Sequence, residues 1–107
     1  RNLEAVQHAM WADVHEEGGT GRRAKIEGYA ICGKTGTAEV RNGGRRDKIT
    51  WFTSYAPYKR PRYAVVVMLE GGISGGRTAP IAKKIFEALR DCDIELSRRH
   101  NGALTNN

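Results

Sequence analysis

A run of six consecutive apolar residues, Ala64-Val65-Val66-Val67-Met68-Leu69, constrains most strongly what this chain can fold into. The run is rich in valine and does not alternate with polar residues, so it predicts a strand over residues 62–70 that is buried on both faces. Such a strand needs cover on both faces and a neighbour along each edge. In a chain of 107 residues, two helices and two other strands barely supply that cover. We therefore expect either a dimer or a longer protein whose other part covers the strand.

Two further strands are predicted upstream of this run. Residues 26–40 become β-like, and residues 49–56 are rich in β-branched and aromatic side chains. The segment Asn42-Gly43-Gly44 lies between them and is a strong hairpin signal. The three strands are therefore expected to form an antiparallel meander.

A helix is predicted at each end of the chain. Apolar residues over 3–16 are spaced three and four apart, and the glycine-rich residues 18–21 then end that helix. Pro80 suits the first turn of a second helix, which is expected to reach about Leu96 before a polar, frayed tail over 97–107. The apolar face of the first helix consists of Leu3, Val6, Met10 and Val14.

This order of elements predicts an α+β fold: a three-stranded antiparallel meander with a helix at each end. We expect residues 1–96 to form one structural unit, with residues 97–107 as its tail. The glycine-rich residues 71–76 are expected to form a flexible loop between the third strand and the second helix.

Composition excludes several classes of protein. The longest apolar run falls far short of the roughly 20 residues that a membrane span needs. Two cysteines, Cys32 and Cys92, are too few for a disulfide framework. The three histidines lie far from both cysteines in the sequence, so we expect neither a metal site nor a cofactor.

The segment Gly33-Lys34-Thr35-Gly36-Thr37 is the most informative stretch for function. Together with Gly28 it satisfies the phosphate-loop pattern of nucleotide-binding proteins. That loop requires a helix beginning at Lys34, whereas β-prone residues and a hairpin turn follow. The context therefore disfavours a nucleotide site, which stays an alternative.

As part of a strand, the same segment predicts a site for a carboxylate-bearing peptide. Alternation puts Thr35 and Thr37 on one face and Lys34 on the other, and Gly36 leaves room for another backbone to approach closely. Two hydroxyls, an ammonium group and a bare strand edge suit a peptide that is laid alongside as an extra strand.

The ordered set of motifs around this segment resembles the C-terminal part of the transpeptidase domain of class B penicillin-binding proteins. The resemblance covers residues 6–89, and its motifs stand in the expected order of strand, hairpin, strand, loop and helix. The matching residues are Gly33-Lys34-Thr35-Gly36-Thr37-Ala38-Glu39, Trp51-Phe52-Thr53-Ser54-Tyr55-Ala56-Pro57, residues 63–70, residues 71–76 and Ala79-Pro80-Ile81-Ala82.

The resemblance implies a serine β-lactamase-like fold and a peptidoglycan D,D-transpeptidase, which transfers an acyl group from a D-alanyl-D-alanine stem peptide through an acyl-serine. β-Lactams acylate the same serine. Lys34 and Thr37 would be catalytic, because the ammonium supports proton transfer and the Thr37 backbone N–H forms one arm of the oxyanion hole. Thr35, Gly36 and Thr37 would bind the substrate, with both hydroxyls offered to its terminal carboxylate.

The chain departs from the family pattern in its nucleophile. No serine here is followed three residues later by lysine, and no Ser-x-Asn motif is present. We therefore expect a fragment that is inactive alone and needs the N-terminal remainder of the domain. The parent protein should work outside the cytoplasm, in the periplasm or on the outer face of the cell membrane, and be tethered to that membrane by a segment absent here.

Besides the nucleotide site, two other interpretations of function stay open, and one prediction concerns assembly. A sensor domain of a β-lactam-responsive receptor would share much of this motif set. The basic residues between Arg41 and Arg62 could form a nucleic-acid footprint, although solvated hairpin ends explain them better, and we expect no nucleic-acid partner. An unpaired edge on the strand over residues 62–70 would allow self-association of the chain.

Overall fold

The computed structural model describes residues 2–71 and 77–105, which form a three-stranded antiparallel sheet with a helix at each end. The α+β meander predicted from the sequence is confirmed. The loop expected over residues 71–76 lies outside the described residues, except for Gly71. The elements are α1 (Asn2–His15), the short 3-10 helix η1 (Arg22–Ala24), β1 (Cys32–Asn42), β2 (Arg45–Ala56), β3 (Tyr63–Glu70) and α2 (Thr78–Thr105).

The strands follow one another in the order β1-β2-β3, so β1 and β3 are the edges of this sheet. Gly43 and Gly44 form the turn between β1 and β2 with φ values of +58° and +84°. A two-residue hairpin turn of type I′ needs positive φ at both positions, which glycine adopts without strain. The predicted hairpin at this place is therefore confirmed.

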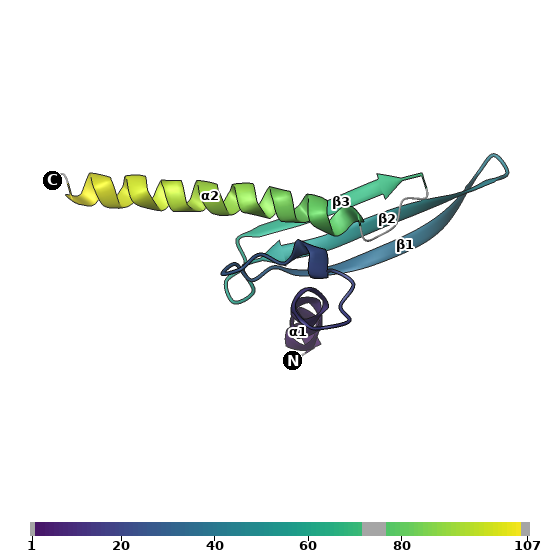
Figure 1. Cartoon of the computed structure of the whole chain (residues 1–107), viewed down its shortest axis with the longest axis horizontal. Coiled ribbons are helices and arrows are strands. Elements are labelled where there is room, and N and C mark those ends of the chain that lie inside the picture. The colour runs from purple at the N-terminus through teal and green to yellow at the C-terminus, as the bar shows by residue number, and fades with distance from the viewer. Residues whose placement is uncertain (1, 72–76, 106–107) are drawn as a thin grey trace.

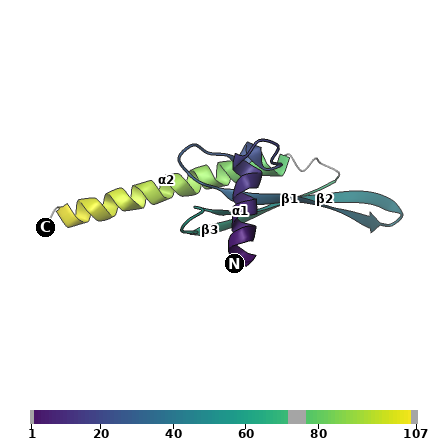
Figure 2. The same cartoon turned by 90° about the horizontal axis from the view of Figure 1, so that it is seen from below.

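The two long helices occupy different sides of the sheet. Helix α2 covers one face and extends well beyond the end of the strands (Figure 1). Helix α1 lies beside β1, with its axis running across the edge of the sheet (Figure 2). His15, at the end of α1, ties the helix to the start of β1 through Nε2, which lies 3.0 Å from the carbonyl oxygen of Ile31.

The core lies between the sheet and α2. Phe52 of β2 and Phe86 of α2 are fully buried there, together with Val14 at the end of α1 and Ile31 just before β1. Gly33 has no side chain because the ring of Phe52 occupies the space that a Cβ atom would need. The start of β1 is thereby packed directly against the core.

Strand β3 is buried on one face only, which corrects the prediction of a strand buried on both. Burial alternates along β3, and Val67 is the buried residue at its centre. On the opposite face Val66 and Met68 remain 64% and 60% exposed. No element within residues 2–71 and 77–105 covers that face. The apolar run thus has the composition of a strand covered on both faces, although the described residues cover only one of them.

Helix α1 also differs from its predicted amphipathic packing. Of the predicted apolar face only Val14 is buried, whereas Leu3 and Val6 are 70% and 55% exposed. The reason is that α1 crosses the sheet edge and contacts the body of the protein through its C-terminal half.

Helix α2 continues to Thr105 and does not end near Leu96, so residues 97–105 are helical where an aperiodic tail was expected. An ion pair between Glu95 and Arg99, with Nε and Oε1 3.1 Å apart, spans the predicted end at the i, i+4 spacing that favours a helix. Asp93 anchors the helix to β3, because it accepts a 2.6 Å hydrogen bond from the Tyr63 hydroxyl and pairs with Arg62 at 3.3 Å.

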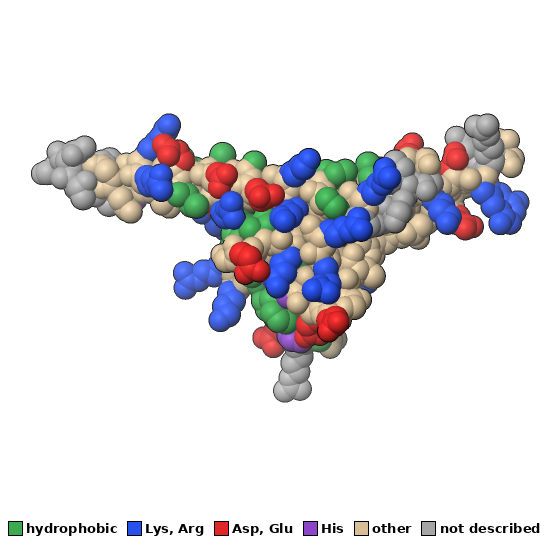
Figure 3. Space-filling model, viewed as in Figure 1, with side chains coloured by type: hydrophobic (Ala, Val, Ile, Leu, Met, Phe, Trp, Pro, Cys, Tyr) green, Lys and Arg blue, Asp and Glu red, His purple; other side chains and the backbone are tan. Residues whose placement is uncertain are grey.

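Lysine and arginine side chains are dispersed over the visible face of the molecule, with Asp and Glu side chains among them (Figure 3). A nucleic-acid footprint usually gathers basic residues on one stripe or patch. The dispersed pattern on this face is typical of solvated charge.

Candidate active site

The predicted site residues lie together in the first half of β1, on the edge of the sheet beside α1 (Figure 1). Thr35 lies opposite Phe52, and Thr37 lies opposite Thr50; both partners are buried on the core face. Lys34 therefore projects from the other face, as alternation predicts.

The phosphate-loop alternative does not fit this backbone. It requires a helix that begins at Lys34, whereas β1 runs without interruption from Cys32 to Asn42. The glycine-lysine-threonine segment therefore belongs to a strand, and the nucleotide-binding interpretation is wrong for this chain.

The polar groups of the motif are accessible. Lys34 and Thr37 are exposed, and Thr35 is half-buried. The Lys34 ammonium lies 3.4 Å from the backbone oxygen of Thr35, and no carboxylate of the described residues forms an ion pair with it. An edge strand also leaves alternate backbone N–H and C=O groups without a partner strand. Both a cation and a strand edge are therefore available to a ligand.

A side chain within the chain also accounts for Gly36, where we expected the close approach of another backbone. Gly36 lies directly opposite Trp51 in the β1–β2 ladder, and a Cβ atom at position 36 would overlap the Trp51 indole. The indole therefore lies on the same face of the sheet as Lys34.

The Thr35 hydroxyl is already engaged within the chain. It donates a 2.8 Å hydrogen bond to Oγ1 of Thr20, and Thr20 in turn donates a 2.8 Å hydrogen bond to Oδ1 of Asp13. Sequence reasoning missed both partners, because residues 18–21 are expected only to end the first helix and Asp13 is not singled out by the pattern. An aspartate in the last turn of a helix, followed by Gly-Gly-Thr-Gly, was the available signal.

Cys32 begins β1 immediately before the motif. It is a free, fully buried thiol, and burial raises the pKa of that thiol above its ordinary value of 9.0. A thiol in this state is a poor nucleophile at neutral pH. Cys32 is therefore a packing residue beside the site.

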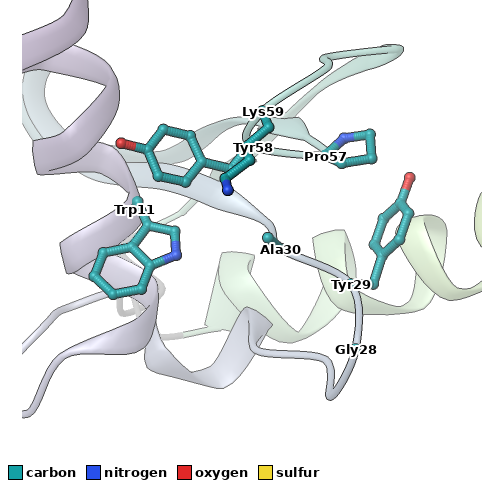
Figure 4. A pocket seen from close by; sticks show the side chains of 7 residues that line it. All are labelled: Trp11, Gly28, Tyr29, Ala30, Pro57, Tyr58 and Lys59. Atoms are coloured by element: carbon teal, nitrogen blue, oxygen red, sulfur yellow. The ribbon is translucent and has the colours of Figure 1, made fainter.

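A separate pocket of about 390 Å³ lies between α1, the loop before β1 and the β2–β3 connection (Figure 4). Its walls include Trp11 and Tyr58, whose rings stack with centroids 6.1 Å apart, and Tyr29 on the far side. The residues of the Lys34–Thr37 segment do not line this pocket. The pocket and the motif are thus two distinct features of the surface.

Among residues 2–71 and 77–105, no group of three or more His, Cys, Asp or Glu side chains is placed to hold a metal ion. Within the same residues, neither helix has a stretch that is apolar enough and long enough to span a bilayer.

Comparison with known proteins places this chain in a family. Residues 1–87 match the family described as "Penicillin binding protein transpeptidase domain". The peptidoglycan D,D-transpeptidase MrdA of Haemophilus influenzae is 35% identical over 98 residues, covering 78% of this chain and 15% of that protein. The penicillin-binding protein PbpB of Mycolicibacterium smegmatis is 38% identical over 98 residues, covering 81% of this chain and 14% of that protein.

Solved structures agree with the sequence comparison. The D,D-transpeptidase domain of a peptidoglycan glycosyltransferase from Eggerthella lenta superimposes with a TM-score of 0.63 at 35% identity, over 82% of this chain and 20% of that one. The chain therefore spans only about 15% of the length of the curated relatives just described. On this match of sequence and fold, the chain belongs to the penicillin-binding protein transpeptidase domain family.

Proposed function

We propose that this chain forms the carboxylate-binding and oxyanion part of a peptidoglycan D,D-transpeptidase. The observation that carries the proposal is the exposed Lys34-Thr35-Gly36-Thr37 segment on the edge strand of a family member. The comparisons support the reaction class, because MrdA is named a peptidoglycan D,D-transpeptidase and PbpB is named a penicillin-binding protein.

In this proposal the substrate is a stem peptide that ends in D-alanyl-D-alanine. A serine from the rest of the domain attacks the carbonyl carbon of the penultimate D-alanine and forms an ester. The terminal D-alanine leaves with the proton that the serine loses. The amine of a neighbouring stem peptide then attacks the ester, forms the cross-link and releases the serine.

Lys34 and Thr37 act in those steps. The ammonium of Lys34 supplies positive charge beside the serine and the substrate carboxylate, which favours both proton transfer and binding. The backbone N–H of Thr37 donates to the oxyanion that forms on the attacked carbonyl, and its exposed hydroxyl donates to the terminal carboxylate. Gly36 lets the peptide lie flat along β1.

The partners follow from the same chemistry. They are the stem peptide, β-lactams that mimic its D-alanyl-D-alanine end, and the remainder of the transpeptidase domain, which brings the serine. The site of action is outside the cytoplasmic membrane, where the cell wall is assembled, with the parent protein tethered by a segment beyond this chain. In this proposal the 107 residues alone form no acyl-enzyme.

The test is the intact mass of the full-length protein after incubation with benzylpenicillin. We expect one penicillin adduct on the wild type and on the control variant Lys84→Ala, whose lysine is exposed on α2. Lys34→Ala should acylate about 10²-fold more slowly, and this chain alone should carry no adduct. A folded full-length protein without an adduct, or equal rates for the two lysine variants, would contradict the proposal.

A further inference from the structure

The pocket between α1, the loop before β1 and the β2–β3 connection, here called the aromatic pocket, is walled mainly by aromatic and proline side chains. Trp11 and Tyr58 form one wall, and Tyr29 and Pro57 stand across from them (Figure 4). Its volume of about 390 Å³ falls within the range of about 300–1,000 Å³ that ligand sites occupy. No residue of the Lys34–Thr37 segment lines it, so the proposed reaction leaves this pocket without a use.

Neighbouring rings hold the Trp11 indole in one orientation. The imidazole of His15 stacks on it with ring centroids 5.0 Å apart, and the Tyr58 ring stacks on it with centroids 6.1 Å apart. His15 is itself tied to the chain before β1, because its Nε2 lies 3.0 Å from the carbonyl oxygen of Ile31. The indole nitrogen points toward the space between the two walls (Figure 4). Trp11 therefore presents a fixed N–H donor, and little rotamer freedom is lost when a ligand accepts from it.

The polar side chains that face the aromatic pocket are donors. The indole N–H of Trp11 and the ammonium of Lys59 donate hydrogen bonds and have no acceptor capacity. The Tyr58 hydroxyl points away from the opposite wall (Figure 4), and the Tyr29 hydroxyl is buried. Lys59 forms no ion pair within the described residues, and no Asp, Glu, Asn or Gln among them lines the pocket. A ligand that fits must therefore be apolar, rich in acceptors and poor in donors.

A proline-rich segment in the polyproline II conformation has this chemistry. Each of its residues exposes a carbonyl oxygen, whereas proline has no N–H. Prolines three residues apart lie on the same edge of this helix, about 9 Å from one another, and such segments dock in aromatic-lined grooves. A sugar ring carries several hydroxyl donors, for which the side chains facing this pocket offer no acceptor. The lining therefore favours a proline-rich peptide over a sugar.

We propose that the aromatic pocket binds a proline-rich, polyproline II segment of a partner protein. One proline packs against Trp11 and Tyr58 and a second against Tyr29, while a backbone carbonyl oxygen accepts from Nε1 of Trp11. An acidic side chain beside the prolines pairs with Lys59. Because the aromatic pocket is separate from the Lys34–Thr37 segment, a partner held there leaves that segment open to its substrate. The inference does not depend on the proposed function.

Binding of a fluorescein-labelled peptide to the full-length protein tests this inference. The probe is a short run of prolines that ends in two glutamates, and the control peptide of the same length has glycine and serine in place of the prolines. We expect the proline probe to bind at least about tenfold more tightly, because its polyproline II conformation is formed before binding. Equal affinity for the two peptides, or no binding of the proline probe, would overturn the inference.

Variants of the aromatic pocket test its donors. Trp11→Phe keeps an aromatic wall and removes the N–H, so it should weaken binding of the proline probe about fivefold. Lys59→Glu should weaken it about fivefold, because an ion pair is replaced by a like-charge contact. The matched control is Lys84→Glu, at an exposed lysine of α2, which should change the affinity less than about twofold. Equal affinity in the wild type and Trp11→Phe, or equal losses in the two lysine variants, would contradict the proposal.

The peptide assay needs no catalysis, so its result is separable from that of the proposed function. Benzylpenicillin should acylate the full-length protein at the same rate with and without the proline probe. A probe that blocks acylation would lie in the active site, which would overturn the inference. Probe binding without any acylation would contradict the proposed function alone, and acylation without probe binding would contradict this inference alone.

Discussion

Trp51 lies with its indole over the Cα atom of Gly36, its direct partner across the β1–β2 ladder. On the opposite face of β1 the ring of Phe52 fills the corresponding space at Gly33. Two aromatic rings from adjacent positions of β2 thus hold the motif strand from both sides. This packing requires glycine at both positions, in addition to any requirement that a ligand imposes.

Substituting Gly36 by alanine should therefore destabilise the protein. The added methyl group overlaps the Trp51 indole, and the ring must move, at a cost of about 1–3 kcal/mol in the free energy of unfolding. Urea denaturation of the wild type and of Gly36→Ala measures this cost. In a Trp51→Ala background the cost should vanish, because the overlapping ring is absent.

Gly102→Ala is the matched control for that substitution. Gly102 lies in α2, and a Cβ atom there meets nothing within 4 Å. The substitution should raise stability by about 0.5–1 kcal/mol, because alanine favours the helix. If Gly36→Ala behaved like Gly102→Ala, the packing of Trp51 on Gly36 would be refuted.

The two thiols should react at very different rates. Cys92 is exposed on α2, whereas Cys32 is fully buried and its pKa is raised by burial. A thiol-specific disulfide reagent at pH 7.5 should modify one thiol per chain quickly and the second only at the rate of unfolding. Cys92→Ser should remove the fast phase, and Cys32→Ser the slow one. Two fast phases would show that β1 is not packed as described.

Stability should fall as the pH rises above about 9. Burial raises the pKa of Cys32 above 9.0 and those of Tyr29 and Tyr55 above 10.0 in the folded state. Below pH 9 these groups are protonated in both states, and their full contribution is present. At higher pH the unfolded chain releases protons that the folded chain retains, so unfolding becomes more favourable.

Urea midpoints between pH 7 and 11 measure this loss. Tyr29→Phe removes a buried hydroxyl that has no hydrogen-bond partner among the described residues. It should therefore leave stability at pH 7 unchanged or raised and flatten the decline above pH 10. A steeper decline in Tyr29→Phe than in the wild type would contradict the burial of this group.

The uncovered face and edge of β3 should make this chain associate with itself when it is produced alone. Val66 and Met68 are exposed on that face, and β3 is a sheet edge. Val66→Lys should weaken association roughly tenfold, as expected for losing one buried valine. Leu3→Lys, an equally exposed apolar residue on α1, should not. A wild-type chain that sediments as a monomer at high concentration would rule out association through this surface.

The strands were predictable because their signals are local. The hairpin follows from two glycines that adopt positive φ, and the faces of Lys34 and Thr35 follow from simple alternation. The start of β1 was placed too early, at residue 26 instead of Cys32. Ile26 and Ile31 are apolar because a loop buries them in the core, and a short apolar pattern does not distinguish such a loop from a strand.

The contacts that hold the site were not predictable from local pattern. Thr20 bonds to residues seven and fifteen positions away, through a loop whose path depends on Asp13. The apolar run of β3 was recognised, but no described residue covers the face that carries Val66 and Met68. In both cases the sequence shows the residue types, whereas the partners are set by the path of the chain in three dimensions.

Release of D-alanine from a stem peptide tests the central claim most directly. The full-length protein is supplied with a peptide ending in D-alanyl-D-alanine and an amine acceptor, with and without prior treatment with benzylpenicillin. We predict penicillin-sensitive release in the wild type and in Lys84→Ala, and about 10²-fold slower release in Lys34→Ala. A folded wild type that is acylated by penicillin but releases no D-alanine would indicate a sensor and contradict a transpeptidase. Equal rates of D-alanine release in the wild type and in Lys34→Ala would show that Lys34 takes no part in the reaction.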